Sequence, residues 1–207
     1  EWIIITGMVV GSLPFAHYLA MVRGGWRSLL NDPQVRLFLI LAVGLVLLWI
    51  WHLVQTGLGF GQAVRQASFN GVSIMTGTGY VSANFSAWGG FATTILLIVM
   101  FIGGCGGSTT CGIKVFRLQV LASTAKVQIS RLLRPHAVVL AYYNKRPVSI
   151  EVMDSVMGFF YLFILGFVLI AIMLGMAGLD FVTALSGAAT SISNVGPGLG
   201  EVIGADG

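Results

Sequence analysis

The stretch SFNGVSIMTGTGY, residues 68–80, changes character halfway along its length. Its first half is compatible with a short helix, whereas Thr76, Gly77, Thr78 and Gly79 alternate small hydroxyl residues with glycine. Glycine is a poor residue for a helix interior, because it loses more conformational freedom on folding than any other residue. We therefore predict a short helix followed by extended backbone whose carbonyl groups face a ligand.

The composition of the 207-residue chain places this stretch in a membrane protein. Hydrophobic residues make up 57% of the chain and charged residues only 9%, and the mean hydropathy is +0.93. Soluble domains carry about 25% charged residues, so we predict an all-α polytopic membrane protein. The chain begins at Glu1 inside an apolar run, and we interpret it as a piece of a longer polypeptide.

Several apolar segments are long enough to cross a bilayer, which takes roughly 20 residues. The predicted crossings are residues 2–21 with a kink at Pro14, 37–57, 89–121 and 154–176. The crossing at 89–121 contains the small-residue run 103–112, which is poorly suited to a regular helix. We expect this run to form a loop inside the membrane.

Two further segments are too short to cross. Residues 62–75 and 181–190 are each followed by a glycine-rich stretch, residues 76–80 and 191–200. We interpret each pair as a half-helix that enters the membrane and an extended return. Such irregular backbone is tolerated at membrane depth only where it is buried in protein or lines a watery cavity.

The basic residues support this topology. Ten of the eleven fall in two loops, three in residues 23–36 and seven in residues 114–146. Both loops lie on one side only if residues 62–80 re-enter rather than cross, and the positive-inside rule makes that side cytoplasmic. The membrane topology thus accounts for the basic pI near 9.4 without a nucleic-acid partner. The second loop is either a partner surface or a topology signal that contacts anionic lipid.

The order of crossing, half-helix and glycine return occurs twice. A shift of 117 residues places residues 76–80 over 193–197, and Gly79 over Gly196. A half-helix that ends near the membrane centre directs the negative end of its dipole there. An extended return then offers carbonyl groups that replace the hydration shell of a cation such as K⁺. Four such walls are needed around an axis, and this chain holds two.

The pieces GTGY, GGCGGSTTCGIKVFR and TSISNVGPGLG make the chain resemble the Trk/Ktr/HKT superfamily of K⁺ transporters, and most of all the bacterial Trk-type potassium uptake membrane subunit. The resemblance implies repeated helix–pore-loop–helix units around a central ion pore. It assigns residues 1–36 to the end of repeat two and a cytoplasmic linker, 37–150 to repeat three and 151–207 to repeat four without its last span. It also implies a homodimer in the bacterial inner membrane and a cytosolic nucleotide-binding regulatory subunit that faces residues 114–146.

The same resemblance implies K⁺ uptake, with K⁺ as the transported ion, no covalently bound cofactor and no partner other than protein and membrane lipid. The implied K⁺ selectivity filter consists of Thr76, Gly77, Thr78 and Gly79 together with Ser193, Asn194, Val195 and Gly196. The implied gating loop consists of Gly103, Gly104, Cys105, Gly106, Gly107, Ser108, Thr109, Thr110, Cys111 and Gly112.

Other interpretations stay open. Gly77 and Gly79 could form a plain turn, and residues 103–112 could serve close helix packing. A membrane enzyme is a second interpretation, but the predicted spans contain no cluster of nucleophilic or acidic residues. A secondary transporter that couples a solute to Na⁺ or H⁺ is a third, but such a site usually includes an intramembrane charge, and the predicted spans are nearly free of charges. We expect packing or interface roles for the isolated His17, His52 and His136, burial for Cys105 and Cys111, and an outer-mouth position for Glu201 and Asp206.

Overall fold

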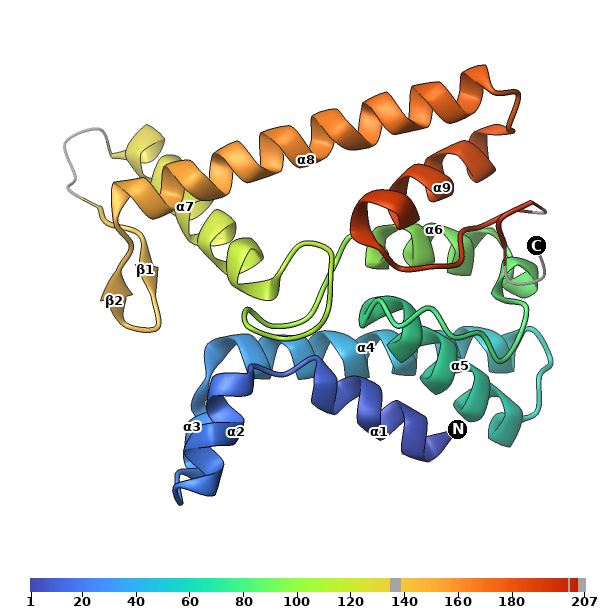
Figure 1. Cartoon of the computed structure of the whole chain (residues 1–207), viewed down its shortest axis with the longest axis horizontal. Helices are drawn as coiled ribbons and strands as arrows, with labels where there is room; N and C mark the ends of the chain where they lie inside the picture. Colours follow the sequence, from blue (N-terminus) through green and yellow to red (C-terminus); the bar gives the residue numbers. More distant parts are fainter. Residues whose placement is uncertain (135–138, 201, 205–207) are drawn as a thin grey trace.

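The computed structural model describes residues 1–134, 139–200 and 202–204, and it is almost entirely helical (Figure 1). The predicted all-α fold class is confirmed. The described residues contain two helices long and apolar enough to cross a membrane, α4 (Pro33–Gln55) and α8 (Ile150–Met176), or three spans if the bent pair at the N-terminus counts as one.

The N-terminal segment is a broken helix. α1 (Trp2–Gly11) and α2 (Phe15–Val22) are bent by 96° relative to each other. Pro14 has no backbone N–H with which to continue the hydrogen-bond ladder of α1. The single kinked crossing predicted for residues 2–21 is therefore a pair of helices, and the short α3 (Trp26–Asn31) follows it.

α4 begins at a well-defined cap, because the Asp32 carboxylate accepts a hydrogen bond of 2.7 Å from the Gln34 N–H, and Pro33 occupies the first helical position. After a tight turn, α5 (Phe60–Met75) folds back along α4 (Figure 1). The half-helix predicted at residues 62–75 thus begins two residues earlier.

The next crossing is interrupted, as its small residues predict. After the short 3₁₀ helix η1 (Phe85–Trp88), α6 (Gly90–Val99) is only 10 residues long. A non-helical segment of residues 100–114 follows, and α7 (Val115–Leu133) continues the chain. β1 (Tyr142–Tyr143) and β2 (Arg146–Pro147) then form a small antiparallel hairpin before α8.

α9 (Phe181–Ser193) folds back along α8 as α5 does along α4 (Figure 1). The Asp180 carboxylate caps its first turn by accepting from the N–H groups of Val182 and Thr183. The predicted half-helix 181–190 therefore extends to Ser193, which we had expected in the extended return. Asn194 ends the helix with φ +53, a left-handed conformation that asparagine tolerates better than most residues.

The main core lies between α4, α5 and α6. The largest side chain that is completely buried in it is Trp49 of α4. Gly71 of α5 lies directly against this indole, since a β-carbon built on Gly71 would be 2.5 Å from Trp49 Cζ3. The close packing of the half-helix on its crossing helix therefore depends on a residue without a side chain at this position.

We expect Gly71→Ala to lower the free energy of unfolding of the intact protein by about 1–3 kcal/mol, the usual cost of overpacking. Gly61→Ala on the same helix is the matched control, because no atom lies within 4 Å of its added β-carbon. Thermal unfolding in detergent, followed by tryptophan fluorescence, measures both. Equal melting temperatures for the two variants would contradict the packing argument.

Candidate functional site

The two glycine-rich returns lie side by side. A β-carbon built on Gly79 would lie well inside contact distance of the Val195 carbonyl oxygen, and one on Gly196 would lie 3.2 Å from the Gly79 Cα. Gly79 also has φ +77, a conformation that side chains rarely adopt. The fold thus brings together two segments that lie more than a hundred residues apart, and it leaves no room for a side chain where they meet.

Each return is clamped by a polar side chain of its own half-helix. Asn70, which is completely buried in α5, accepts from the Ser82 N–H at 3.0 Å and donates to the Ser82 hydroxyl at 3.1 Å. Ser186 of α9 likewise accepts from the Leu199 N–H at 2.9 Å and donates to the Leu199 carbonyl at 3.1 Å. Ser82 and Leu199 are themselves related by the predicted shift of 117 residues. The far ends of the two returns are therefore tied back to their half-helices in the same way.

The return after α9 directs two carbonyl groups toward the other return. The Thr190 hydroxyl bonds both the N–H and the carbonyl of Gly196, each at 2.9 Å, so that this carbonyl turns back to its own helix. The Asn194 and Val195 carbonyls face the opposite way, and the first lies 3.4 Å from a β-carbon built on Gly77. Carbonyl oxygens in such a position are the ligands that a desolvated alkali cation needs.

A cavity of about 320 Å³ opens beside the first return. Thr76 and Thr78, whose hydroxyl oxygens are 2.8 Å apart, line it together with residues of α1. Thr109 and Thr110 of the 103–112 loop line it as well. The cavity therefore connects the predicted filter residues with the predicted gating loop.

The loop has a closed neck. The Gly103 N–H donates to the Ile113 carbonyl and the Ile113 N–H to the Phe101 carbonyl, each at 2.9 Å. The two backbone segments of the neck approach so closely that a β-carbon on Gly103 would collide with the Cys111 carbonyl. Inside the neck, the Gly104 N–H donates to the Thr110 hydroxyl at 2.8 Å. The loop is thus a folded unit with its own internal bonds.

The body of the loop docks on the break between α1 and α2. Because helix ends carry unpaired backbone groups, the break offers carbonyl and N–H partners to the loop. The Cys105 N–H donates to the Ser12 carbonyl at 3.0 Å, and the Thr109 N–H and hydroxyl donate to the Gly11 carbonyl at 3.2 and 2.9 Å. In the opposite direction, the Phe15 N–H donates to the Gly107 carbonyl of the loop at 3.1 Å.

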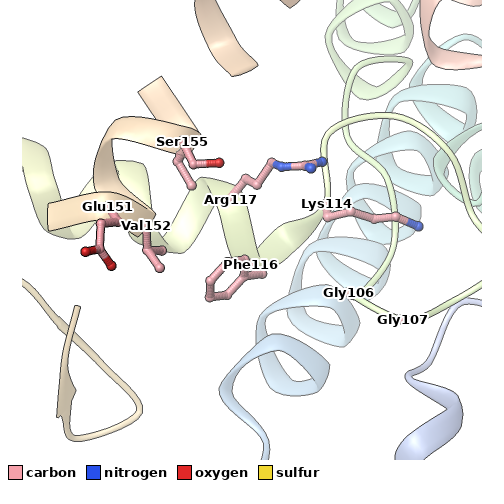
Figure 2. Close-up of a pocket in the computed structure, with 9 residues that line it drawn as sticks. Gly106, Gly107, Lys114, Phe116, Arg117, Glu151, Val152 and Ser155 are labelled. Carbon is pink, nitrogen blue, oxygen red and sulfur yellow. The ribbon is translucent and has the colours of Figure 1, made fainter. Parts of the chain in front are cut away.

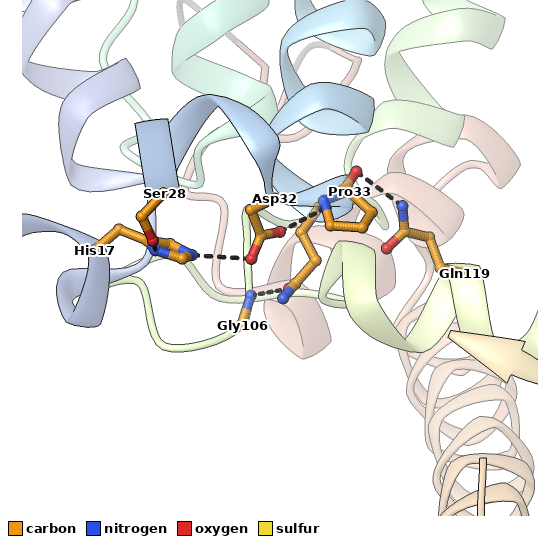
Figure 3. Close-up of polar contacts among 7 residues, drawn as sticks. His17, Ser28, Asp32, Pro33, Gly106 and Gln119 are labelled. Atoms are coloured by element: carbon orange, nitrogen blue, oxygen red, sulfur yellow. Dashed lines mark hydrogen bonds and ion pairs between the residues drawn. The ribbon is translucent and has the colours of Figure 1, made fainter. Parts of the chain in front are cut away.

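A side chain at the start of α4 holds the loop from a second side (Figure 3). The Gly106 N–H donates to Gln34 Oε1 at 2.8 Å. Gln34 lies two residues after Asp32, whose carboxylate accepts from the Gln34 N–H and lies 2.8 Å from His17 Nε2. His17 Nδ1 is in turn 2.9 Å from the Ser28 hydroxyl. This polar chain links α2 and α3 to the loop through the first turn of α4.

The hairpin reaches the same glutamine. The Tyr143 side chain lies beside the Gln34 side chain, and its ring packs edge-on against Phe116 of α7 at 4.9 Å between centroids. Burial, and to a lesser extent the Asp32 carboxylate, raise the pKa of Tyr143 to about 12, so the hydroxyl keeps its proton at physiological pH. Gln34 is therefore the point where the loop, α4 and the hairpin meet.

Lys114 holds the last part of the loop. Its ammonium group donates to the Thr110 carbonyl and lies 3.1 Å from the Thr110 hydroxyl. Lys114, Gly106 and Gly107 also line a second cavity of about 590 Å³ between the loop, α7 and α8 (Figure 2). Arg117, whose guanidinium lies 3.9 Å above the Phe159 ring, borders this cavity as well. The loop thus contributes residues to two cavities, one beside the glycine returns and one beside the basic start of α7.

Several of these residues were not predicted as functional. Gln34, Asn70, Ser186 and the break at residues 11–15 act through contacts with distant segments, which no local pattern shows. Of the two cysteines predicted to be buried, Cys105 is buried but Cys111 is exposed. His17 and His52 both form hydrogen bonds within the protein, His17 with Asp32 and His52 Nε2 with the Trp88 carbonyl at 2.8 Å. His136, Glu201 and Asp206 lie outside the described residues.

Comparison with known proteins places this chain in a family. The TrkH family model, described as a cation transport protein, matches residues 19–205. The Trk system potassium uptake protein TrkI of Halomonas elongata is 42% identical over 198 residues, which cover 95% of this chain and 40% of that protein. The Trk system potassium uptake protein TrkH of Vibrio parahaemolyticus is 35% identical over 194 residues, covering 90% of this chain and 39% of that protein.

A solved structure agrees with these sequence relatives. The crystal structure of the potassium transporter TrkH from Vibrio parahaemolyticus superimposes with a TM-score of 0.86 at 33% sequence identity, and the match covers 98% of this chain and 45% of that one. The chain spans about 40% of the length of the curated relatives it matches. Since the family model covers most of its length, the chain belongs to the TrkH family of cation transport proteins.

Proposed function

We propose that the intact protein takes up K⁺ through a carbonyl-lined filter, and that this chain supplies two of its four walls and the loop that gates it. The observation that carries the proposal is the meeting of the two glycine returns, at Gly79 and Gly196, beside the cavity that the loop also lines. The relatives named potassium uptake proteins support K⁺ as the transported ion.

The electrostatics of the two half-helices favour a cation at this point. α5 ends at Met75 and α9 at Ser193, each one residue before its return begins. The C-terminal end of a helix carries about half a negative charge from its unpaired carbonyl groups. We infer that both dipoles stabilise K⁺ while the Asn194 and Val195 carbonyls replace water around it.

The loop acts as the gate in this proposal. It lies between the cavity beside the returns and the cavity beside Lys114, and its anchors are Gln34, Lys114 and the break between α1 and α2. Opening the route between the cavities requires that some of these hydrogen bonds break. Each is worth only about 1 kcal/mol, so the loop can be both ordered and movable.

The orientation and the partners follow the charge pattern. By the positive-inside rule, we propose that the basic 23–36 and 114–146 segments face the cytoplasm and that the intact protein is a multi-pass protein of the bacterial inner membrane. α7 and the hairpin would then face a cytosolic nucleotide-binding regulatory subunit, and the intact protein would form a homodimer.

We expect Gly79→Ser or Gly196→Ser in the intact protein to lower the preference for K⁺ over Na⁺ by about tenfold, which corresponds to about 1.4 kcal/mol. The added side chain pushes the two returns apart and thereby shifts the Asn194 and Val195 carbonyls. Rb⁺ and Na⁺ uptake into proteoliposomes measures the preference. Gly61→Ser, in open space on α5, is the control; unchanged selectivity in both filter variants would refute the assignment.

We expect Gln34→Ala to raise K⁺ flux about fivefold, because one lost hydrogen bond of about 1 kcal/mol shifts the loop toward its open position by that factor. Gln34→Glu keeps an acceptor for the Gly106 N–H and should stay near the wild-type flux. Tyr143→Phe, which removes the hydroxyl beside Gln34 but keeps the ring packing on Phe116, should have an intermediate effect. A lower flux in Gln34→Ala with normal folding would count against a gate.

A further inference from the structure

A third cavity, of about 780 Å³, lies between the first turns of α4 and the tip of the hairpin. Arg36, Leu37 and Ile40 of α4 line it on one side, and Asn144 and Lys145 of the hairpin turn line it on the other. It shares no residue with the two cavities that border the loop. The transport route therefore does not account for it.

The charges in this cavity favour an anion. Arg36 and Lys145 line it, and none of its described lining residues is a carboxylate. The carboxylate closest in sequence, Asp32, is already engaged by the Gln34 N–H and by His17. Arg36 also lies in the first turns of α4, where the positive end of the helix dipole disfavours a cation and favours an anion.

The two cations are held in place by local structure. Arg36 Nη2 donates to the Asn31 side-chain oxygen at 2.9 Å, which orients the guanidinium at the end of α4. Lys145 occupies the second position of a two-residue hairpin turn, in which Asn144 has φ +46 and Lys145 φ +64. Both positions of such a turn are left-handed, so the turn fixes where the lysine backbone lies.

An apolar stripe leads away from the cavity along α4. Ile40, Val43, Leu47 and Trp51 follow Arg36 at helical spacing, and they are 67, 57, 60 and 58% exposed. α4 is one of the helices long and apolar enough to cross a membrane, so the stripe lies at the depth of the hydrocarbon. Two cations at the end of an exposed apolar stripe match the shape of a lipid with an anionic headgroup.

We propose that this cavity binds the headgroup of an anionic phospholipid of the cytoplasmic leaflet, with an acyl chain along Ile40, Val43 and Leu47. The stripe is what favours a phospholipid over an acidic protein segment, because only the lipid places an anion and a hydrocarbon chain in that order across the interface. The proposal rests on the orientation given under the proposed function, with this end of α4 cytoplasmic, but it does not depend on transport.

The test uses the intact protein in nanodiscs made of phosphatidylcholine, with phosphatidylglycerol of the same acyl chains titrated in and bound lipid counted by native mass spectrometry. We expect phosphatidylglycerol to be retained in preference to phosphatidylcholine. The Arg36→Gln/Lys145→Gln double variant should weaken this retention by tenfold or more, since each basic residue near an anionic surface is worth about a factor of five. Lys145→Gln alone, at an exposed turn, should give a smaller loss and keeps the test valid if the double variant misfolds.

Arg131→Gln/Arg134→Gln is the matched control, because it removes the same charge from exposed positions at the end of α7. Ile40→Trp keeps both cations but narrows the path of the acyl chain, and it should also reduce retention. Equal losses in the control, or no preference for phosphatidylglycerol in the wild type, would overturn the proposal. Displacement of the lipid by millimolar inorganic phosphate would overturn it too, since it would make the site one for a free anion.

Discussion

In the proposed topology the 103–112 loop lies in the hydrocarbon of the bilayer, where every backbone N–H and C=O must find a partner inside the protein. Within the loop and its neck, the N–H groups of Gly103 and Gly104 donate to Ile113 and Thr110. Outside it, the N–H groups of Cys105, Gly106 and Thr109 find their acceptors on Ser12, Gln34 and Gly11 in that order. The break between α1 and α2 has the same problem, and the loop solves it by supplying the Gly107 carbonyl to Phe15. Two irregular segments that would each be costly alone are therefore stable as a pair.

The same constraint shapes the glycine returns, where a half-helix ends and no neighbouring strand is available. Asn70 and Ser186 supply the missing partners for Ser82 and Leu199, and they tie the far end of each return back to its own half-helix. Once these ends are fixed, the backbone between them can present carbonyls to a cation instead of to the protein. The clamp thus explains how a flexible glycine sequence can hold a defined geometry, which ion selection requires.

Local pattern was enough to predict some of this structure and not the rest. The alternation of glycine with Thr76 and Thr78, and the small residues from Gly103 onward, locate the returns and the loop, because glycine acts on its own backbone. The contact between Gly106 and Gln34 joins residues 72 positions apart, and that between Thr109 and Gly11 joins residues 98 apart; neither leaves a periodic trace. α9 runs on to Ser193 because Asn194 accepts a left-handed conformation, which makes the helix end a property of one side chain.

The anchors of the loop also connect it to α7 and the hairpin, which the proposed topology places on the cytoplasmic side. α7 starts at the residue after Lys114, which holds Thr110, and Gln119 of α7 donates to the Pro33 carbonyl at 2.9 Å, next to Gln34. Tyr143 of the hairpin lies beside Gln34. A displacement of α7 and the hairpin against α4 therefore changes the Lys114 and Gln34 anchors together. Because a helix is stiff along its axis, force applied to the far end of α7 can reach the loop without any separate signalling element.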